Sequence, residues 1–264
     1  MNPRSFAPWA ATCVALLAPA VCFGSVFIMD EFTGDPGLVI LTSGGQGFDG
    51  TYTGAGRVVS PGLTYPNLRT AGNAFQTAGR DNGALRALSN PIGTGGTVYV
   101  GFLAAATQGT VPDYAGVWLM NVGLVNNIFL GKPSQSDGYG FEVRGIEGWK
   151  QTLAGAPVST TPSLLVYRFT FTDHGDTIDF FADPTPGRPL PATPTLTFAI
   201  PEGKLPQDFS SIQLVSGGGA GTGTPFLFDE LRVGSSFADV APVPEPAALG
   251  LLCVVAPLAL RRRR

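Results

Sequence analysis

The clearest structural signal in the sequence is the run LLVYRFTFT, Leu164–Thr172. From Leu165 to Phe171 every second residue is large and apolar, and the residues between them become polar toward the end of the run. Successive side chains of a β-strand point to opposite faces, so this pattern predicts a strand with one buried face. The turn-forming residues Asp173–Asp176 follow, and a second apolar run starts at Thr177. The two runs therefore predict an antiparallel hairpin.

Similar short apolar runs recur along the chain, separated by glycine and proline turns. The predicted strands are Ser25–Phe32, Thr97–Ala105, Ala115–Asn121, Asn126–Gly131, Tyr139–Arg144, Ser163–Thr172, Thr177–Asp183, Thr195–Ala199, Ile212–Ser216 and Phe226–Val233. No stretch keeps a 3.6-residue period, although Tyr65–Ala87 leaves room for a short helix or turn. Pro184–Pro194 is predicted to be a long surface loop. The series fits an all-β protein, an antiparallel β-sandwich of roughly a dozen strands.

The composition agrees with a folded β protein. Glycine (36 residues) and proline (23) are abundant, phenylalanine occurs 18 times, and only 13% of residues are charged. Such a composition is typical of short strands joined by turns and not of a disordered chain. About 220 residues suffice for one large β domain with its own core.

The two ends of the chain differ from this body. At the N-terminus, Arg4 precedes an apolar run from Trp9 to Ala20, and Gly24-Ser25 is a plausible cleavage point, which predicts a secretory signal peptide over residues 1–24. A lipoprotein site at Cys22 is the alternative, although Val21 stands where such sites favour a small residue.

The C-terminus carries a Pro-Glu-Pro motif, an apolar run of 14 residues (247–260) and a basic end. A helix needs ~20 residues to cross a hydrocarbon core of about 30 Å, so this run is short for a permanent anchor. Arginines stay on the cytoplasmic side of a membrane, which would leave the main body outside. An ordinary single-pass tail anchor is the alternative reading.

These three parts resemble the PEP-CTERM sorting signal of Gram-negative bacteria. The matching residues are Pro244, Glu245 and Pro246 for the motif and Arg261, Arg262, Arg263 and Arg264 for the basic end. The resemblance implies that an exosortase, a membrane cysteine protease, cuts near the motif after a transient membrane anchoring. The expected location is the cell envelope or the extracellular space.

Removal of both ends would change the chemistry of the protein. The three cysteines, Cys13, Cys22 and Cys253, lie in these segments, so the exported domain is expected to use no internal disulfide. Lys plus Arg falls from 16 to 11 and Asp plus Glu from 19 to 18, which leaves a net charge of about −7 against −3 for the precursor. No basic stripe remains, so the charge pattern argues against nucleic acid and against an anionic bilayer surface as partners.

The body resembles the concanavalin-like, laminin-G-like jelly roll of exported bacterial proteins. The resemblance rests on Asp30–Phe32, Thr97–Phe102, Ala115–Trp118 and Phe228–Gly234. It implies a sandwich over residues 25–236, followed by a linker at 237–243. It also implies that the first and last strands lie side by side and bring Asp30 near Asp229.

That resemblance further implies a structural calcium beside the terminal strands. Asp229, with Asp30 or a carbonyl from Gly45–Gly50, could supply oxygen ligands. The alternative is that these acids pair with Arg232 or with water. No other cofactor is predicted.

The carboxylates do not form a recognisable pair for glycoside hydrolysis, the activity of some relatives of this fold. Hydrolysis needs two carboxylates about 5–9.5 Å apart across one bond. Three pairs of acids are close in sequence. Asp176 with Asp179, and Asp229 with Glu230, would point to opposite faces of a strand. Asp179 and Asp183 would share a face, but their spacing is wide. The only histidine, His174, lies in a predicted turn. The sequence therefore predicts a protein that is not an enzyme.

Glycan binding is the alternative function, and it needs an exposed aromatic side chain with polar neighbours. Trp149 lies in a polar, glycine-flanked segment, and Tyr114 and Tyr139 border loops, whereas Trp118 lies in an apolar strand and is expected in the core. The favoured prediction is an exported, non-enzymatic surface protein. The alternatives are a carbohydrate-binding module for matrix polysaccharide that uses Trp149, or a glycoside hydrolase or lyase with an unfamiliar site.

Overall fold

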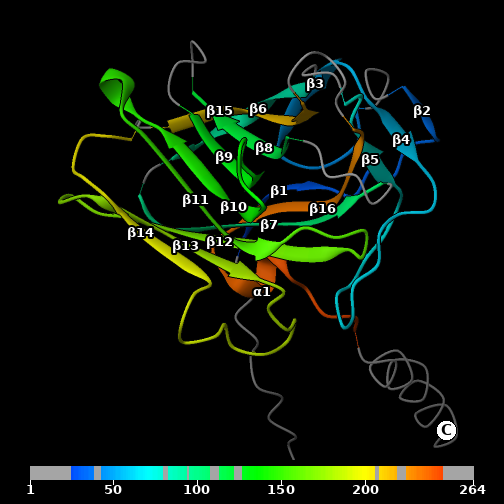
Figure 1. Cartoon of the computed structure of the whole chain (residues 1–264). Coiled ribbons are helices and arrows are strands. Elements are labelled where there is room, and N and C mark those ends of the chain that lie inside the picture. Colours follow the sequence, from blue (N-terminus) through cyan, green and yellow to red (C-terminus); the bar gives the residue numbers. More distant parts are fainter. Residues whose placement is uncertain are drawn as a thin grey trace, which may run out of the picture.

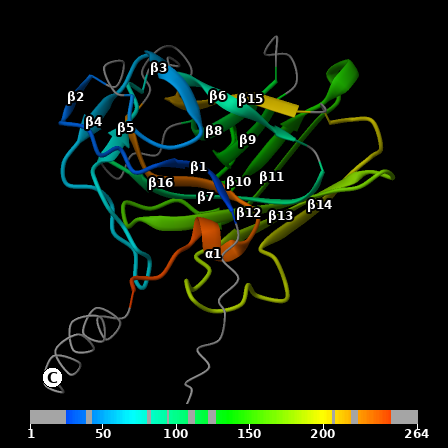
Figure 2. The same ribbon diagram turned by 180° about the vertical axis from the view of Figure 1, so that it is seen from behind.

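The computed structural model describes residues 25–38, 43–79, 83–93, 95–107, 113–121, 127–205, 208–218 and 224–245. These residues form two antiparallel sheets packed face to face (Figure 1), and the view from behind shows the same two layers (Figure 2). The antiparallel β-sandwich predicted from the sequence is confirmed. The expected signal peptide, the apolar run 247–260 and the arginine cluster lie outside the described residues.

One sheet contains nine of the described strands. In spatial order they are β14 (Leu196–Ile200), β13 (Asp176–Ala182), β12 (Ser163–Phe171), β7 (Gly96–Ala106), β16 (Phe226–Gly234), β5 (Ala74–Gln76), β4 (Arg57–Val59) and β2 (Gly37–Leu38), with β1 (Val26–Asp30) also beside β16. The first and last strands, β1 and β16, are paired as expected.

The other sheet contains seven of the described strands. In spatial order they are β11 (Lys150–Pro157), β10 (Gly138–Arg144), β9 (Asn127–Lys132), β8 (Tyr114–Met120), β15 (Asp208–Gly217), β6 (Ala84–Gly93) and β3 (Phe48–Gly54). A 3-10 turn, η2 (Ile146–Gly148), joins β10 to β11.

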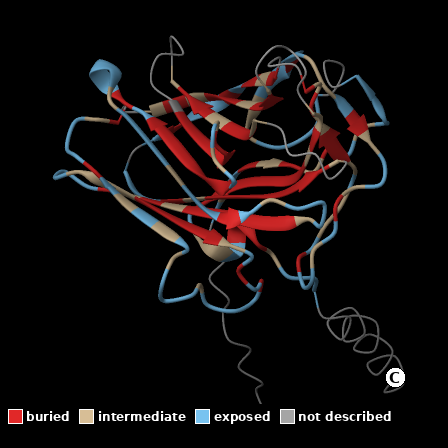
Figure 3. Ribbon diagram, in the orientation of Figure 1, coloured by how far each residue is buried: buried red, intermediate tan, exposed pale blue. Residues whose placement is uncertain are grey.

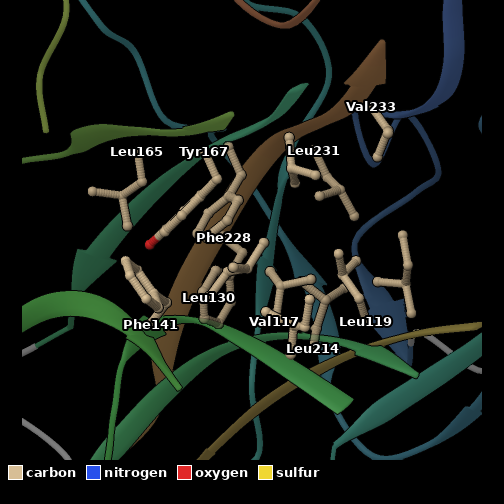
Figure 4. Close-up of a cluster of buried hydrophobic side chains, with 14 of the residues drawn as sticks. Val117, Leu119, Leu130, Phe141, Leu165, Tyr167, Leu214, Phe228, Leu231 and Val233 are labelled. Atoms are coloured by element: carbon tan, nitrogen blue, oxygen red, sulfur yellow. The ribbon is translucent and has the colours of Figure 1, made fainter. Parts of the chain in front are cut away.

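The run LLVYRFTFT forms β12 and pairs on one side with β13 and on the other with β7, so the predicted hairpin is confirmed. Tyr167 points into the sandwich, stacks on Phe180 at 4.9 Å and donates a hydrogen bond of 2.8 Å to the carbonyl oxygen of Gly140 in the opposite sheet. Figure 4 shows this inner layer, in which Tyr167 and Phe228 of the nine-stranded sheet lie near Phe141 of the other. The core is therefore built from one face of each sheet.

Several strands of the structure were not predicted from the apolar alternation in the sequence. The segment Tyr65–Ala87, which left room for a short helix or turn, contains a turn at Pro66-Asn67. It also contains β5 and the start of β6, which were not predicted. The elements β2, β3, β4 and β11 were not predicted. In β3, for example, Tyr52 is the only buried residue, so its sequence shows no apolar alternation.

The central strands β12, β7 and β16 of the nine-stranded sheet are buried on the outer face as well (Figure 3). Leu103, Leu164, Val166 and Phe181 form a second apolar cluster there. Loop residues that include Leu63, Leu68 and Leu190 pack onto this cluster. The first half of β12 is therefore apolar on both faces because both faces are covered, in contrast to the single buried face expected.

The C-terminal part of the described chain completes this cover. The helix α1 (Phe237–Val240) begins with a capping box between Ser236 and Asp239. Val240 packs against β7 at Gly101, where an added Cβ atom would lie 2.9 Å from the Val240 side chain. The backbone N–H of Arg69 then donates a hydrogen bond of 2.7 Å to the Pro242 carbonyl. The folded body thus continues through the segment expected as a linker, and Pro244 and Glu245 follow it as exposed residues.

None of the helices within the described ranges is long and apolar enough to span a bilayer.

Candidate functional site

The outer face of the seven-stranded sheet carries a row of large side chains. On β8, Val117 and Leu119 point into the core, so Trp118 points outward. The strand register places Gln213 of β15 on one side of Trp118 and Phe129 of β9 on the other. Glu142 of β10 lies next to Phe129 in the same row.

These side chains line a pocket of about 380 Å³. The lining residues are Tyr114, Trp118, Met120, Phe129, Ser134, Glu142, Arg144 and Gln213. Phe129 is only 2% exposed although it belongs to neither apolar core cluster, because the pocket aromatics cover it from outside. Its ring centroid lies 4.8 Å from that of Trp118 and 6.1 Å from that of Tyr114.

Gly116 makes room for this aromatic group. A Cβ atom at this position would lie 2.6 Å from Cζ of Phe129 and 2.2 Å from the Leu130 carbonyl oxygen. Glycine therefore allows the Phe129 ring to rest directly on strand β8, where it supports Trp118 and Tyr114.

Glu142 is the carboxylate of the pocket. One of its oxygens accepts a hydrogen bond of 2.6 Å from Nε of Arg144, and the other is 3.0 Å from Nζ of Lys150 and 3.2 Å from the Thr152 hydroxyl. Burial opposes ionisation of this group, but the hydrogen bonds from Lys150 and Arg144 outweigh it and hold the pKa of Glu142 below its ordinary value. The carboxylate is therefore charged at neutral pH.

The guanidinium of Arg144 also lies 4.6 Å from the centre of the Trp118 ring, a cation–π contact. It thus joins the aromatic and the charged parts of the pocket. The arrangement offers apolar ring surface beside hydrogen-bond donors and acceptors, which suits a ligand that has both kinds of surface.

The aromatic residues considered in the sequence analysis lie in different environments in the structure. Trp118, expected in the core, instead lines the pocket, so that expectation was wrong. Tyr139 is fully buried between the sheets. Tyr114 does line the pocket. Trp149 is half-buried, packs against the core and stacks on Phe198 with ring centroids 5.9 Å apart, so its neighbour is a protein ring.

Glu142 and Arg144 were missed in the sequence, although a signal for them exists. In GYGFEVR (Gly138–Arg144), the large apolar side chains at 139, 141 and 143 alternate with Gly140, Glu142 and Arg144. The apolar set fills the core, which sends the second set outward.

The structure does not bring the side chains of Asp30 and Asp229 together. Asp30 lies opposite Leu231, a core residue, and its Oδ2 accepts a hydrogen bond of 2.9 Å from the Tyr52 hydroxyl of the seven-stranded sheet. Asp229 instead accepts a hydrogen bond of 2.7 Å from the backbone N–H of Leu63, in a loop on the outer face. The two carboxylates therefore serve opposite faces of the sheet.

Two of the oxygen donors that the sequence offered to calcium, Asp30 and the Gly50 carbonyl, bind an arginine. The Arg86 guanidinium lies 3.5 Å from Asp30 and donates hydrogen bonds to the carbonyl oxygens of Ser43, Gly44 and Gly50. It also lies over the rings of Phe48 and Tyr52 at 4.5 and 5.2 Å. A side-chain cation thus occupies this cluster. Across the described parts of the chain, no three acidic, histidine or cysteine side chains gather in a metal-binding group.

The other acidic residues considered in the sequence analysis form ion pairs or hydrogen bonds within the domain. Asp179 binds Arg168 at 2.6 Å, and Asp183 accepts a hydrogen bond from the Leu164 N–H. Glu230 binds Arg232, whereas Asp229 has no cationic partner within the described residues. Burial raises the pKa of Asp229 to about 8. His174 is exposed in its turn.

No family model matches the chain, and no curated protein matches it in sequence. The endo-1,3-beta-glucanase from Streptomyces sioyaensis has a similar structure, with 11% identity and a TM-score of 0.50 over 82% of this chain and 98% of the glucanase. The cellulose-induced protein Cip1 matches with 13% identity and a TM-score of 0.47, over 79% of this chain and 97% of Cip1.

The receptor-binding domain of botulinum neurotoxin D matches with 10% identity and a TM-score of 0.44, over 70% of this chain. The match covers 45% of that domain, so the present chain spans less than half of its length. At these identities the likeness concerns the β-sandwich fold alone.

Proposed function

We propose that this protein binds carbohydrate, without cleaving it, in the pocket on the outer face of the seven-stranded sheet. The observation that carries the proposal is the aromatic group of Trp118, Tyr114 and Phe129 beside the polar side chains of Glu142 and Gln213. A sugar ring has apolar C–H faces, which pack on aromatic rings, and hydroxyl groups at its edge, which bind carboxylate and amide groups.

The state of Glu142 supports binding over hydrolysis. A general acid must be protonated before it can donate a proton to the leaving group, and hydrolysis requires a second carboxylate across the bond. Glu142 is held in its charged form by Arg144 and Lys150. Within the described residues, it is also the only carboxylate that lines the pocket.

The binding surface differs from the one expected at Trp149. Trp149 is occupied by its contact with Phe198, whereas Trp118 lies in the wall of an open pocket. The two tryptophans therefore form a matched pair for an experiment, because each is half-buried and each lies on or next to the same sheet.

The test compares Trp118→Ala and Trp149→Ala with the wild-type protein on a panel of neutral and acidic polysaccharides. Soluble 1,3-β-glucan belongs in the panel because the glucanase shares the fold. We expect Trp118→Ala to weaken binding by about tenfold or more and Trp149→Ala to leave it nearly unchanged. Thermal melting curves control for folding. Equal binding by the Trp118 variant, or no wild-type binding to any member, would reject the proposal.

We also propose that this module is exported and released or anchored at the cell surface by an exosortase-type system. The resemblance at Pro244, Glu245 and Pro246 and the N-terminal apolar run support this route. Pro244 and Glu245 are exposed directly after the folded body, where a protease could reach them. Mass spectrometry of the protein isolated from its natural cells tests it, and a single species that retains all four terminal arginines would contradict it.

A further inference from the structure

We infer that the carbohydrate ligand carries negatively charged groups, and that Arg144 and Lys150 bind them. The inference rests on the proposed function, since it concerns the same pocket and names the class of its ligand. The ligand form we favour is a uronate-containing polysaccharide, whose repeated carboxylates lie on the edge of each sugar ring.

The first argument is the balance of charge. Glu142 is one carboxylate with two cationic partners, so the cluster has a net positive charge. The side chain of Glu142 is only 4% exposed, whereas those of Arg144 and Lys150 are 49% and 52% exposed. The buried part of the cluster is therefore negative, and the part that a ligand meets is positive.

The second argument is the supply of unused donors. Among the hydrogen bonds of the described residues, Arg144 uses only Nε, which leaves its two terminal nitrogens. A guanidinium edge of this kind matches the two oxygens of a carboxylate. Lys150 uses its ammonium group for Glu142 and has further N–H donors.

The third argument is position. Arg144 is fixed by Glu142 on one side and by the Trp118 ring at 4.6 Å on the other. A sugar ring that packs against Trp118 would therefore place its edge next to a guanidinium that is already held in place. Groups that are ordered before binding lose less entropy when the ligand arrives.

Two other arginines of the body are matched by acids. Arg232 has two acidic partners, Glu31 and Glu230, and Arg168 has Asp179. At the opposite rim of the pocket, Asp113 accepts a hydrogen bond from Ser134 and lies near Lys132. Arg144 and Lys150 are two cations that share one carboxylate at the pocket. Their effect is local because salt screens charges beyond about 8 Å.

The experiment measures binding of the full-length protein to polygalacturonate and to the same polymer after its carboxyl groups have been reduced to neutral alcohols. We expect the wild type to bind the acidic polymer about tenfold more tightly, and this preference to shrink as salt is raised. The double variant Arg144→Gln/Lys150→Gln should bind both polymers with the lower affinity of the neutral one. The double variant Arg69→Gln/Arg188→Gln removes the same charge from loops on the other sheet and should keep the preference.

Three results separate the two proposals. Equal wild-type affinity for both polymers overturns the inference and leaves carbohydrate binding intact. Loss of the preference in the Arg69/Arg188 control also overturns it, because the preference would then follow net charge and not the pocket. Binding of neither polymer, together with no binding on the wider panel, rejects the proposed function itself. Dextran sulfate serves as a third polymer in the same binding assay. If the protein binds dextran sulfate but not polygalacturonate, the ligand is a sulfated polysaccharide, and the proposal of a uronate-containing ligand is rejected.

Discussion

The outer faces of the two sheets carry similar residues but have different surroundings. On the nine-stranded sheet, Leu103, Val166 and Phe181 are sealed by loops and by α1. On the seven-stranded sheet, Trp118 and Phe129 form the wall of an open pocket. Both faces are rich in apolar side chains, so composition alone does not separate them. What separates them is whether the chain returns to cover the face.

The difference indicates what each face contributes. Apolar side chains covered by the chain itself remain in contact in every folded molecule and so add to stability. An aromatic group that is left open beside polar side chains adds less stability and is typical of an interaction site. The following predictions test this contrast.

The largest expected effect lies on the covered face, at Asp229. Its folded pKa of about 8 exceeds its unfolded value of 3.8, so the folded state holds the proton more tightly. This contribution is complete below pH 3.8 and is lost as the pH rises through 8, by up to about 6 kcal/mol. Chemical denaturation of the wild type and of Asp229→Asn across this range should show a clearly smaller loss in the variant.

The measurement compares the slope of the free energy of unfolding against pH in the two proteins. Asp30, another buried acid with a raised pKa, is present in both. Both oxygens of Asp229 accept backbone N–H groups, from Leu63 and Glu230. The asparagine has only one acceptor oxygen, so its NH2 group must face one of these donors and the variant is expected to be less stable at acidic pH. If the free energy of unfolding changes with pH by the same amount in both proteins, Asp229 is ionised at neutral pH and the prediction is wrong.

A matched pair of aromatic substitutions tests the two faces directly. Phe181→Ala removes a ring from the sealed cluster and should lower the free energy of unfolding by about 4 kcal/mol. Trp118→Ala removes a larger ring from the open pocket and should cost only about 1 kcal/mol. Urea denaturation measures both values. If the two losses are equal, the contrast between a sealed and an open face is wrong.

The smallest expected change in stability concerns α1, the last segment that covers the outer face of the nine-stranded sheet. Val240 is 1% exposed and packs on Gly101, so Val240→Ala should lower the free energy of unfolding by about 2 kcal/mol. Val243 is 44% exposed, and Val243→Ala should change stability by less than about 0.5 kcal/mol. A Val240 variant with unchanged stability would mean that α1 docks independently of the rest of the fold.

The strands that could be predicted from the sequence are those with long apolar alternation. β12 and β16 each have nine residues and were located to within one residue at each end. The short strands β2, β4 and β5 bury too few side chains to give a pattern, and they form because neighbouring strands supply their hydrogen bonds. Such pairing depends on distant parts of the chain.

The candidate site was harder to predict for the same reason. Trp118 lies in a strand that is apolar on both faces, and periodicity shows that two faces exist without showing which one is inside. Only the register with β9 and β10 brings Phe129 and Glu142 to Trp118. The role of Arg86 could not be predicted either, since its partners lie 36 to 56 residues earlier in the chain.

The docked segment 237–242 has a mechanical consequence. It leaves β16 and packs beneath the nine-stranded sheet (Figure 1). The pocket lies on the other sheet, so the segment and the pocket are on opposite layers of the sandwich. Tension between a bound polymer and a C-terminal attachment would first peel this segment away, because each of its contacts would break in turn. β16 would resist longer, since β7 and β1 hold it on both sides and would have to slip together. The segment would thus lengthen the tether by about 3.5 Å per residue while the sandwich kept its fold.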